Sequence, residues 1–269
     1  MNSTIEPLKQ PAIPFIKEGY RRYRMTVEYC GDSFYGWQRQ ALTPTVQAEL
    51  EDALVIVARE KVIVHGAGRT DTGVHALAQA AHFDVQTELH CDHVMLGINY
   101  FLKGKGAVVT SLVPVRPDFH ARFSALSRSY RYYILNRRAA SVVQYPYAWH
   151  IMRPLDHEAM QEAAQLLVGH HDFTAFRDKE CQAQNPCRTL DAFDVIREGD
   201  LITTYLKSRA FLHHQVRIMM GTLKWVGTGH IKPSDVLDIL TSRERKRAGQ
   251  TAPSCGLFFL GADYPEHFD

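Results

Sequence analysis

An arginine and an aspartate stand two residues apart in a glycine-punctuated segment, where Arg69 and Asp71 lie between Gly68 and Gly73. The guanidinium is a planar fork of donors suited to phosphate or carboxylate. The ionised carboxylate only accepts hydrogen bonds, and it can act as a nucleophile. In a locally extended turn both side chains point to one face, and the cation keeps the carboxylate ionised. The alternative is a surface turn closed by an Arg69–Asp71 ion pair without function.

Apolar runs flank this segment at residues 62–64 and 80–85. They predict a strand, a turn and a second strand. The turn lacks the lysine and the glycine spacing of a loop that cradles nucleotide phosphates. The sequence therefore gives no sign of a nucleotide cofactor.

The charge is nearly balanced, with 31 Lys and Arg against 29 Asp and Glu, so the net charge of +2 does not by itself indicate a nucleic-acid partner. Its distribution says more, because arginines gather within residues 21–24, 116–138 and 243–247, with tyrosines at 130, 132 and 133. Such groups can follow a phosphate backbone. They can equally be solvated surface.

Cysteine usage and hydropathy bear on the compartment. The five cysteines are odd in number and widely scattered: Cys30, Cys91, Cys181, Cys187 and Cys255. This favours reduced thiols in a cytoplasm over a disulfide framework, and the absence of a Cys-x-x-Cys pair gives no zinc site. No apolar stretch is long enough to span a membrane, and residues 1–19 lack an export signal. We expect a cytoplasmic protein without a membrane partner.

The pattern of elements predicts an α+β fold. Strands are expected at residues 23–29, 108–113, 192–196, 201–208 and near 252–260, and helices after Thr45, at 92–102, from Asp156 to about 168, from the stretch 210–217 through Trp225, and at 232–240. The first half reads β-α-β-β-α-β, which is ferredoxin-like, and the second half repeats the plan. We predict two ferredoxin-like (RRM-like) halves, 20–118 with Asp71 and 119–269, after a flexible leader at 1–19. Their antiparallel sheets are expected to face a central cleft.

Residues 68–76, called the signature segment below, resemble the signature of the tRNA pseudouridine synthase A family. Further stretches are similar to motifs of that family in the family's order: 34–38, 119–122, 130–132, 172–176, 188–189, 211–217 and 252–257. The resemblance runs from about residue 23 to residue 264.

The resemblance implies an isomerase that converts uridine to pseudouridine at positions 38, 39 and 40 of the tRNA anticodon stem–loop. It implies Asp71 as the catalytic nucleophile, Tyr130 as the active-site tyrosine that stacks on uracil, and Arg217 as the partner of the carboxylate. Arg69 would fill the vacated stack or hold a phosphate, and His75 would contact substrate. The reaction moves a base on one sugar without redox change, so no cofactor is expected. Members of the family are homodimers, so the resemblance also implies a homodimer here. Whether the carboxylate attacks C6 or C1′, or removes a sugar proton, stays open.

Alternatives remain for several of these residues. Tyr130 alone could be a strand tyrosine at a core edge, and Trp37 could anchor its loop by burying aromatic surface. The whole chain could be a catalytically silent RNA-binding protein. A metal-dependent hydrolase would use the paired His213 and His214, but adjacent residues on a helix are not expected to face one point, so no metal is predicted.

Overall fold

The computed structural model describes residues 15–143 and 145–268. Most of the expected leader at 1–19 therefore lies outside the described residues. The described chain forms five α-helices and one mixed β-sheet, which makes it an α+β protein. None of the helices in these two ranges is long and apolar enough to cross a membrane.

The first half has the predicted β-α-β-β-α-β order. Its elements are β1 (Arg21–Tyr29), α1 (Val46–Ala58), β2 (His65–Gly66), β3 (His75–Val85), α2 (Cys91–Leu102) and β4 (Ala107–Val115). Strand β1 runs antiparallel to both β3 and β4. The strand expected at 62–64 starts later than predicted and is only two residues long, whereas β3 already begins inside the signature segment.

The second half carries more strands and three helices. Its elements are β5 (Ser127–Leu135), β6 (Trp149–His150), α3 (His157–Gln165), β7 (Gly169–Asp172), β8 (Cys187–Glu198), β9 (Leu201–Ser208), α4 (Gln215–Gly227), α5 (Asp235–Ser242) and β10 (Leu257–Asp263). The predicted hairpin is the antiparallel pair β8–β9.

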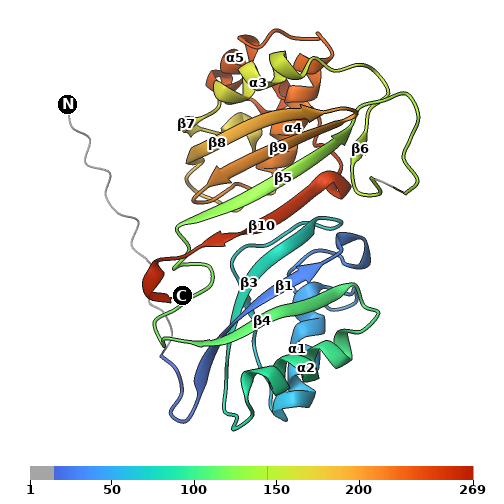
Figure 1. The fold of residues 1–269 in the computed structure, drawn as a ribbon. Helices are drawn as coiled ribbons and strands as arrows, with labels where there is room; N and C mark the ends of the chain where they lie inside the picture. Colours follow the sequence, from blue (N-terminus) through green and yellow to red (C-terminus); the bar gives the residue numbers. More distant parts are fainter. Residues whose placement is uncertain (1–14, 144, 269) are drawn as a thin grey trace, which may run out of the picture.

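The two halves share a single sheet, which corrects the prediction of two antiparallel sheets facing a cleft. The strand order is β4-β1-β3-β10-β5-β9-β8-β7, with β2 on β3 and β6 on β5. Figure 1 shows β10, the last strand, lying between β3 and β5. It pairs antiparallel with β5 and parallel with β3, through Phe258 opposite His75 and Phe259 opposite Ala76. Separate sheets would leave β3 and β5 as open edges with unpaired backbone groups, and β10 satisfies both.

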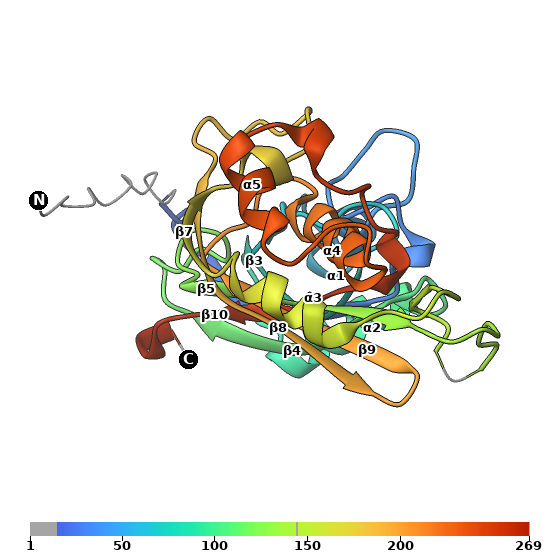
Figure 2. The same ribbon diagram turned by 90° about the horizontal axis from the view of Figure 1, so that it is seen from above.

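Side-chain caps fix where α1 and α3 begin. The Thr45 hydroxyl accepts from the amide of Ala48 at 3.3 Å, and the Asp156 carboxylate accepts from the amides of Glu158 and Ala159. The sequence predicts Asp156 as a cap and, for α1, a hydroxyl within residues 43–45, because a short polar side chain satisfies an amide that the first helical turn leaves unpaired. Helices α1 and α2 lie side by side, and α3 packs on β8 and α4 (Figures 1 and 2). One continuous hydrophobic cluster extends through both halves and makes the sheet a rigid support.

Candidate active site

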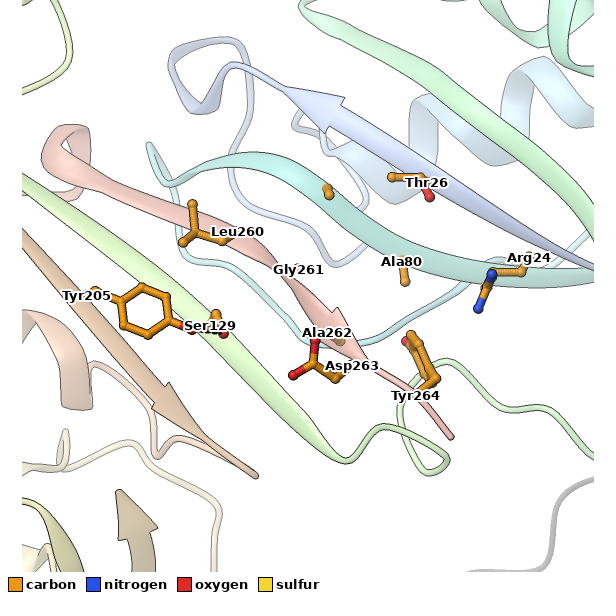
Figure 3. A pocket seen from close by; sticks show the side chains of 11 residues that line it. Arg24, Thr26, Ala80, Ser129, Tyr205, Leu260, Gly261, Ala262, Asp263 and Tyr264 are labelled. Carbon is orange, nitrogen blue, oxygen red and sulfur yellow. Dashed lines mark hydrogen bonds between the residues drawn. The ribbon is translucent and has the colours of Figure 1, made fainter. Parts of the chain in front are cut away.

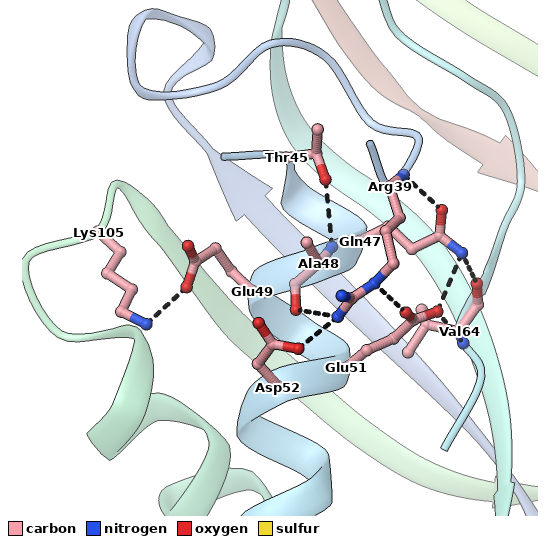
Figure 4. Close-up of polar contacts among 9 residues, drawn as sticks. All are labelled: Arg39, Thr45, Gln47, Ala48, Glu49, Glu51, Asp52, Val64 and Lys105. Atoms are coloured by element: carbon pink, nitrogen blue, oxygen red, sulfur yellow. Dashed lines mark hydrogen bonds and ion pairs between the residues drawn. The ribbon is translucent and has the colours of Figure 1, made fainter. Parts of the chain in front are cut away.

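A polar network fixes the chain before the signature segment (Figure 4). Arg39 donates from its backbone to Gln47 Oε1 at 2.9 Å and from Nε to Glu51 Oε2 at 2.6 Å. The other oxygen of Glu51 accepts from the amide of Val64 at 3.0 Å. Glu51 and Gln47 are buried, and buried polar groups with satisfied bonds hold one geometry. The network ties α1 to the residues that lead into β2.

The polar-aromatic loop at 31–40 supports the signature segment from one side. The amide of Trp37 donates to the carbonyl of Thr70 at 3.1 Å, and the Thr70 and Tyr29 hydroxyls are 2.8 Å apart. Trp37 is buried, which supports an anchoring part for its ring, whereas Tyr35 is exposed. Gly73 has a φ of +77°, a left-handed conformation that glycine adopts without a Cβ clash and that turns the chain back toward β3.

A buried arginine that sequence reasoning missed holds the segment from the other side. Arg128 on β5 donates to the carbonyl of Ala67 at 3.0 and 2.8 Å, and to those of Arg122 and Arg209 at 2.6 Å each. It joins the segment before Gly68 to the 119–122 motif and to the end of β9. An arginine in an alternating strand gives no sequence sign of such a bridge, because the same pattern is usual on a solvated strand face.

Three side chains at or just before the start of α4 lie within 3.5 Å of the carboxylate of Asp71. Its Oδ2 lies 3.0 Å from Nη1 of Arg217 and 3.1 Å from Nε2 of His214, and its Oδ1 lies 3.5 Å from Nε2 of His213. Burial opposes the charged form, but the hydrogen bond and charge of His214 and the charge of Arg217 outweigh it and hold the pKa of Asp71 below its ordinary value. Asp71 is therefore ionised at neutral pH.

Arg69 does not pair with Asp71 in the way the surface-turn alternative requires. Its side chain is exposed, and within residues 15–143 and 145–268 no ion pair joins it to a carboxylate. The cation that keeps Asp71 charged comes from α4 instead. Arg69 is thus exposed to solvent, two residues along the chain from an ionised carboxylate.

Tyr130 lies on β5 with its ring buried. Phe211 and Phe259 meet the ring edge-on, each at a centroid distance of 5.1 Å. Burial raises the pKa of Tyr130 above its ordinary value; the charge of Arg128 opposes the rise and the charge of Asp71 adds to it. The hydroxyl is therefore protonated at neutral pH and within the electrostatic reach of Asp71.

His75, expected to contact substrate, is 2 % exposed. Its Nδ1 accepts from the amide of Gly31 at 3.0 Å, and its ring lies 4.4 Å from that of Tyr147 and 4.6 Å from that of Phe258. These contacts tie the start of β3 to the loop at 31–40 and to β10.

The paired histidines do face one point, contrary to the expectation from helix geometry. His214 precedes the regular turns of α4 with a φ of 60°, and the two rings lie 3.9 Å apart. One ligand atom each from Asp71, His213 and His214 lie within 4.8 Å of one another. However, Oδ2 of Asp71 also receives the guanidinium of Arg217. This fixed positive charge repels a cation at the same oxygen, so we assign no metal to these side chains.

A hollow of about 590 Å³ runs along β10 (Figure 3). Its walls include Ser129 and Tyr205 but none of the three groups Asp71, Tyr130 and Arg217. It is therefore distinct from the carboxylate site.

Comparison with known proteins identifies the family. The sequence model described as tRNA pseudouridine synthase matches residues 25–124 and 163–265. A protein named tRNA pseudouridine synthase A from Methylobacterium sp. (strain 4-46) is 50% identical over 245 residues, covering 91% of this chain and 98% of the relative. The chain belongs to the tRNA pseudouridine synthase A family. The member of this family from Rhodospirillum centenum is 49% identical over 244 residues, covering 91% of this chain and 100% of the relative.

Family membership confirms what the signature segment indicated. The matched ranges contain Asp71 and Arg217, and Tyr130 falls between them. Among solved structures, one titled "Crystal Structure of a Cbf5-Nop10-Gar1 Complex" is similar with a TM-score of 0.37 and 10% identity, covering 88% of this chain and 48% of that chain. Because the TM-score and the identity are this low, we base no conclusion about this chain on that structure.

Proposed function

We propose that this chain isomerises uridine to pseudouridine at positions 38, 39 and 40 of the tRNA anticodon stem–loop. The relatives' names specify tRNA and pseudouridine, and the positions follow from the family resemblance. The observation that carries the proposal is the carboxylate of Asp71, held ionised by Arg217 and His214 at the start of α4. A silent RNA-binding protein has no use for a nucleophile maintained in this way.

The reaction breaks the N1–C1′ bond, turns the uracil and forms a C5–C1′ bond, while the hydrogen on C5 is lost and N1 gains a proton. It requires a negative group at the base or sugar, and Asp71 supplies it. The uridine must leave its stack to reach this group. The proposed part of Tyr130 is to stack on the extruded base and, as a protonated hydroxyl, to exchange a proton. The exposed Arg69 is assigned to the vacated stack or to a neighbouring phosphate.

For His75 we propose that it positions neighbouring residues of the site, in addition to the expected contact with substrate. Its ring is buried and holds Gly31, so it positions the loop at 31–40 against the signature segment. This favours positioning over direct contact in the free protein.

The remaining expectations are also proposals. The chain divides into the halves 20–118, with Asp71, and 119–269, the protein acts as a homodimer in the cytoplasm, and it needs no cofactor. Sedimentation velocity on the full chain tests the dimer, with a monomer mass as the contradicting result.

The nucleophile is tested with Asp71→Asn, which keeps the side chain's size and removes its charge. A tRNA transcript labelled with tritium at uridine C5 releases tritium when pseudouridine forms. We expect release to vanish while tRNA binding in a filter assay persists. Asp92→Asn removes the same charge from an exposed position on α2 and should behave as wild type. Full release by Asp71→Asn rules out the assignment, and a wild type that binds tRNA without release supports a silent RNA-binding protein.

A further inference from the structure

His214 occupies a backbone conformation that needs an explanation. Its φ of 60° and ψ of 5° lie in the left-handed region, at the residue before α4. Its side chain caps no amide of that helix. A non-glycine residue keeps such a conformation only where its surroundings fix it, and such residues gather at functional sites.

Both ring nitrogens of His214 face carboxylate oxygens. Nε2 lies 3.1 Å from Oδ2 of Asp71, and Nδ1 lies 2.8 Å from Oδ2 of Asp178. An ionised carboxylate accepts hydrogen bonds and donates none, so the hydrogen bond to Asp178 places a hydrogen on Nδ1. A second hydrogen on Nε2 makes the ring a cation that pairs with Asp71, and the two carboxylates together favour this doubly protonated imidazolium.

Asp178 is held without help from Asp71. Its Oδ1 accepts from the amide of Glu180 at 2.9 Å, and its backbone amide donates to the carbonyl of His213 at 3.1 Å. The loop after residues 174–176 therefore presents a fixed carboxylate to the far side of the His214 ring. The ring in turn is fixed relative to Asp71.

We propose that His214, held as an imidazolium by Asp178, is a positioning residue that orients the carboxylate of Asp71 for attack and keeps it charged. This inference rests on the proposed function of Asp71. It adds Asp178 and His214 to the groups on which the reaction depends, although neither needs to touch the uridine. Arg217 fixes the same oxygen of Asp71 from the next turn of α4, so two cations define its direction.

The charges around His214 come close to balance. Asp71 and Asp178 are negative, while His214 and Arg217 are positive, and the ring of His213 lies 3.9 Å from that of His214, tilted by 30°. The charge of Asp178 also raises the pKa of Arg245, in the segment after α5, although burial lowers it more. The hydrogen bond to Asp71 raises the pKa of His214, burial opposes the rise, and the charge of Asp71 and the bond to Asp178 add to it. The imidazolium is therefore present below this raised pKa and is lost as the pH rises through it.

The first test replaces Asp178 by Asn and follows kcat for pseudouridine formation against pH. The amide still accepts a hydrogen bond but carries no charge, so the alkaline limb of kcat should move down by about one pH unit. Activity on the acid side of that limb should persist. Glu180→Gln removes the same charge from the same loop, where only its backbone amide joins the network, and its limb should not move.

The second test replaces His214 by Gln. The amide can donate to Asp71 but cannot be held by Asp178 in the same way. We expect kcat to fall about 10- to 100-fold, because small misplacement of a reacting group has effects of this size. KM for tRNA should stay within twofold, and the alkaline limb should disappear.

The protonation state is read without any assay of activity. In the free protein, ¹⁵N-edited spectra of the histidine rings should show both nitrogens of His214 carrying hydrogens at pH 7, and Asp178→Asn should lower the pH at which one is lost. A single protonated nitrogen at pH 7, or an Asp178→Asn profile that matches wild type, overturns the inference while leaving the proposed function intact. If instead the wild-type protein forms no pseudouridine although both nitrogens of His214 carry hydrogens, the proposed function is refuted.

Discussion

Arg217 donates from Nη1 to Oδ2 of Asp71 at 3.0 Å, across 146 positions of sequence, while its Nε donates to the carbonyl of Ala252 at 2.8 Å. One guanidinium thus joins the signature segment, the start of α4 and the stretch before β10. Two donors of a rigid fork fix direction as well as charge. These three stretches, each similar to a family motif, are therefore parts of one site.

Replacing Arg217 tests charge and direction separately. Arg217→Gln removes a cation from Asp71, so the pKa of Asp71 should rise and activity should be lost at a higher pH as the solution is acidified. We expect kcat/KM to fall by roughly 10²- to 10³-fold, as for loss of one preorganised electrostatic contact. Arg217→Lys keeps the charge but loses the fork, so its rate should fall without a shift of the acid limb. An unchanged pH profile in Arg217→Gln would contradict the pairing.

Tyr130→Phe removes the hydroxyl and keeps the ring between Phe211 and Phe259. Because the aromatic contacts survive, the free energy of unfolding should change by less than about 1.5 kcal/mol, the usual net value of one hydrogen bond. The rate of tritium release should fall by about 10²- to 10⁴-fold if the hydroxyl transfers a proton. Urea unfolding and tritium release on the same preparation measure both quantities. Equal rates of tritium release by wild type and Tyr130→Phe would show that the hydroxyl transfers no proton and that Tyr130 acts through its ring alone.

Arg69→Ala should weaken tRNA binding without affecting the fold. The side chain is exposed, so the free energy of unfolding should change by no more than about 0.5 kcal/mol. If the guanidinium contacts a phosphate, the slope of log K against log salt should become less steep by about 1. Filter binding between low and moderate salt gives the slope. Lys61→Ala removes an exposed charge nearby in sequence and should leave the slope as it is.

The histidine pair beside Arg22 should make stability depend on pH. The ring centroids of His82 and His120 lie 4.5 Å apart. Nδ1 of His82 accepts a hydrogen bond from the amide of Ala121, and Nδ1 of His120 accepts one from the amide of Arg122. Burial, and then the nearby histidines and Arg22, lower the pKa of His82 to about 2 and that of His120 to about 4. The unfolded chain binds these protons near pH 6.5, so stability is complete above that pH and falls as the pH drops toward 4.

Denaturant unfolding between pH 4.5 and 6.5 measures this slope. Two protons bound only by the unfolded chain correspond to about 2–3 kcal/mol per pH unit. In His82→Asn the amide oxygen can take the place of Nδ1 as acceptor for Ala121, and the slope should be lower by about 1.4 kcal/mol per pH unit. Parallel curves for this variant and wild type would show that His82 is protonated in the folded protein.

Local chemistry explains what the sequence predicted correctly. A hydroxyl within residues 43–45 and the carboxylate of Asp156 indicate helix starts because capping depends on neighbouring residues alone, and the structure shows caps at Thr45 and Asp156. The order of elements in the first half followed from periodicity in the same way. The signature segment indicated Asp71 as the central group, and it does lie among charged partners; its catalytic role stays a prediction.

The errors concern contacts between distant parts of the chain. The parallel pairing of β3 with β10 depends on which edges meet in the folded protein, and no local pattern encodes that choice. His213 and His214 were expected to diverge because a regular helix was assumed, whereas His214 takes a left-handed backbone. The sequence left Arg128 among arginines that follow a phosphate backbone or lie in solvent, and only the three carbonyls around it reveal its buried bridge.

The seam between β3 and β10 also sets when the site can form during synthesis. The edge of β3 at His75 and Ala76 finds its partners only in Phe258 and Phe259, which the ribosome adds late. Until they emerge, a nascent chain carries the signature segment next to an open strand edge, which other chains can pair with. Translation must therefore pass residue 259 before the two halves can close into a working enzyme, and truncated products should aggregate instead of retaining partial activity.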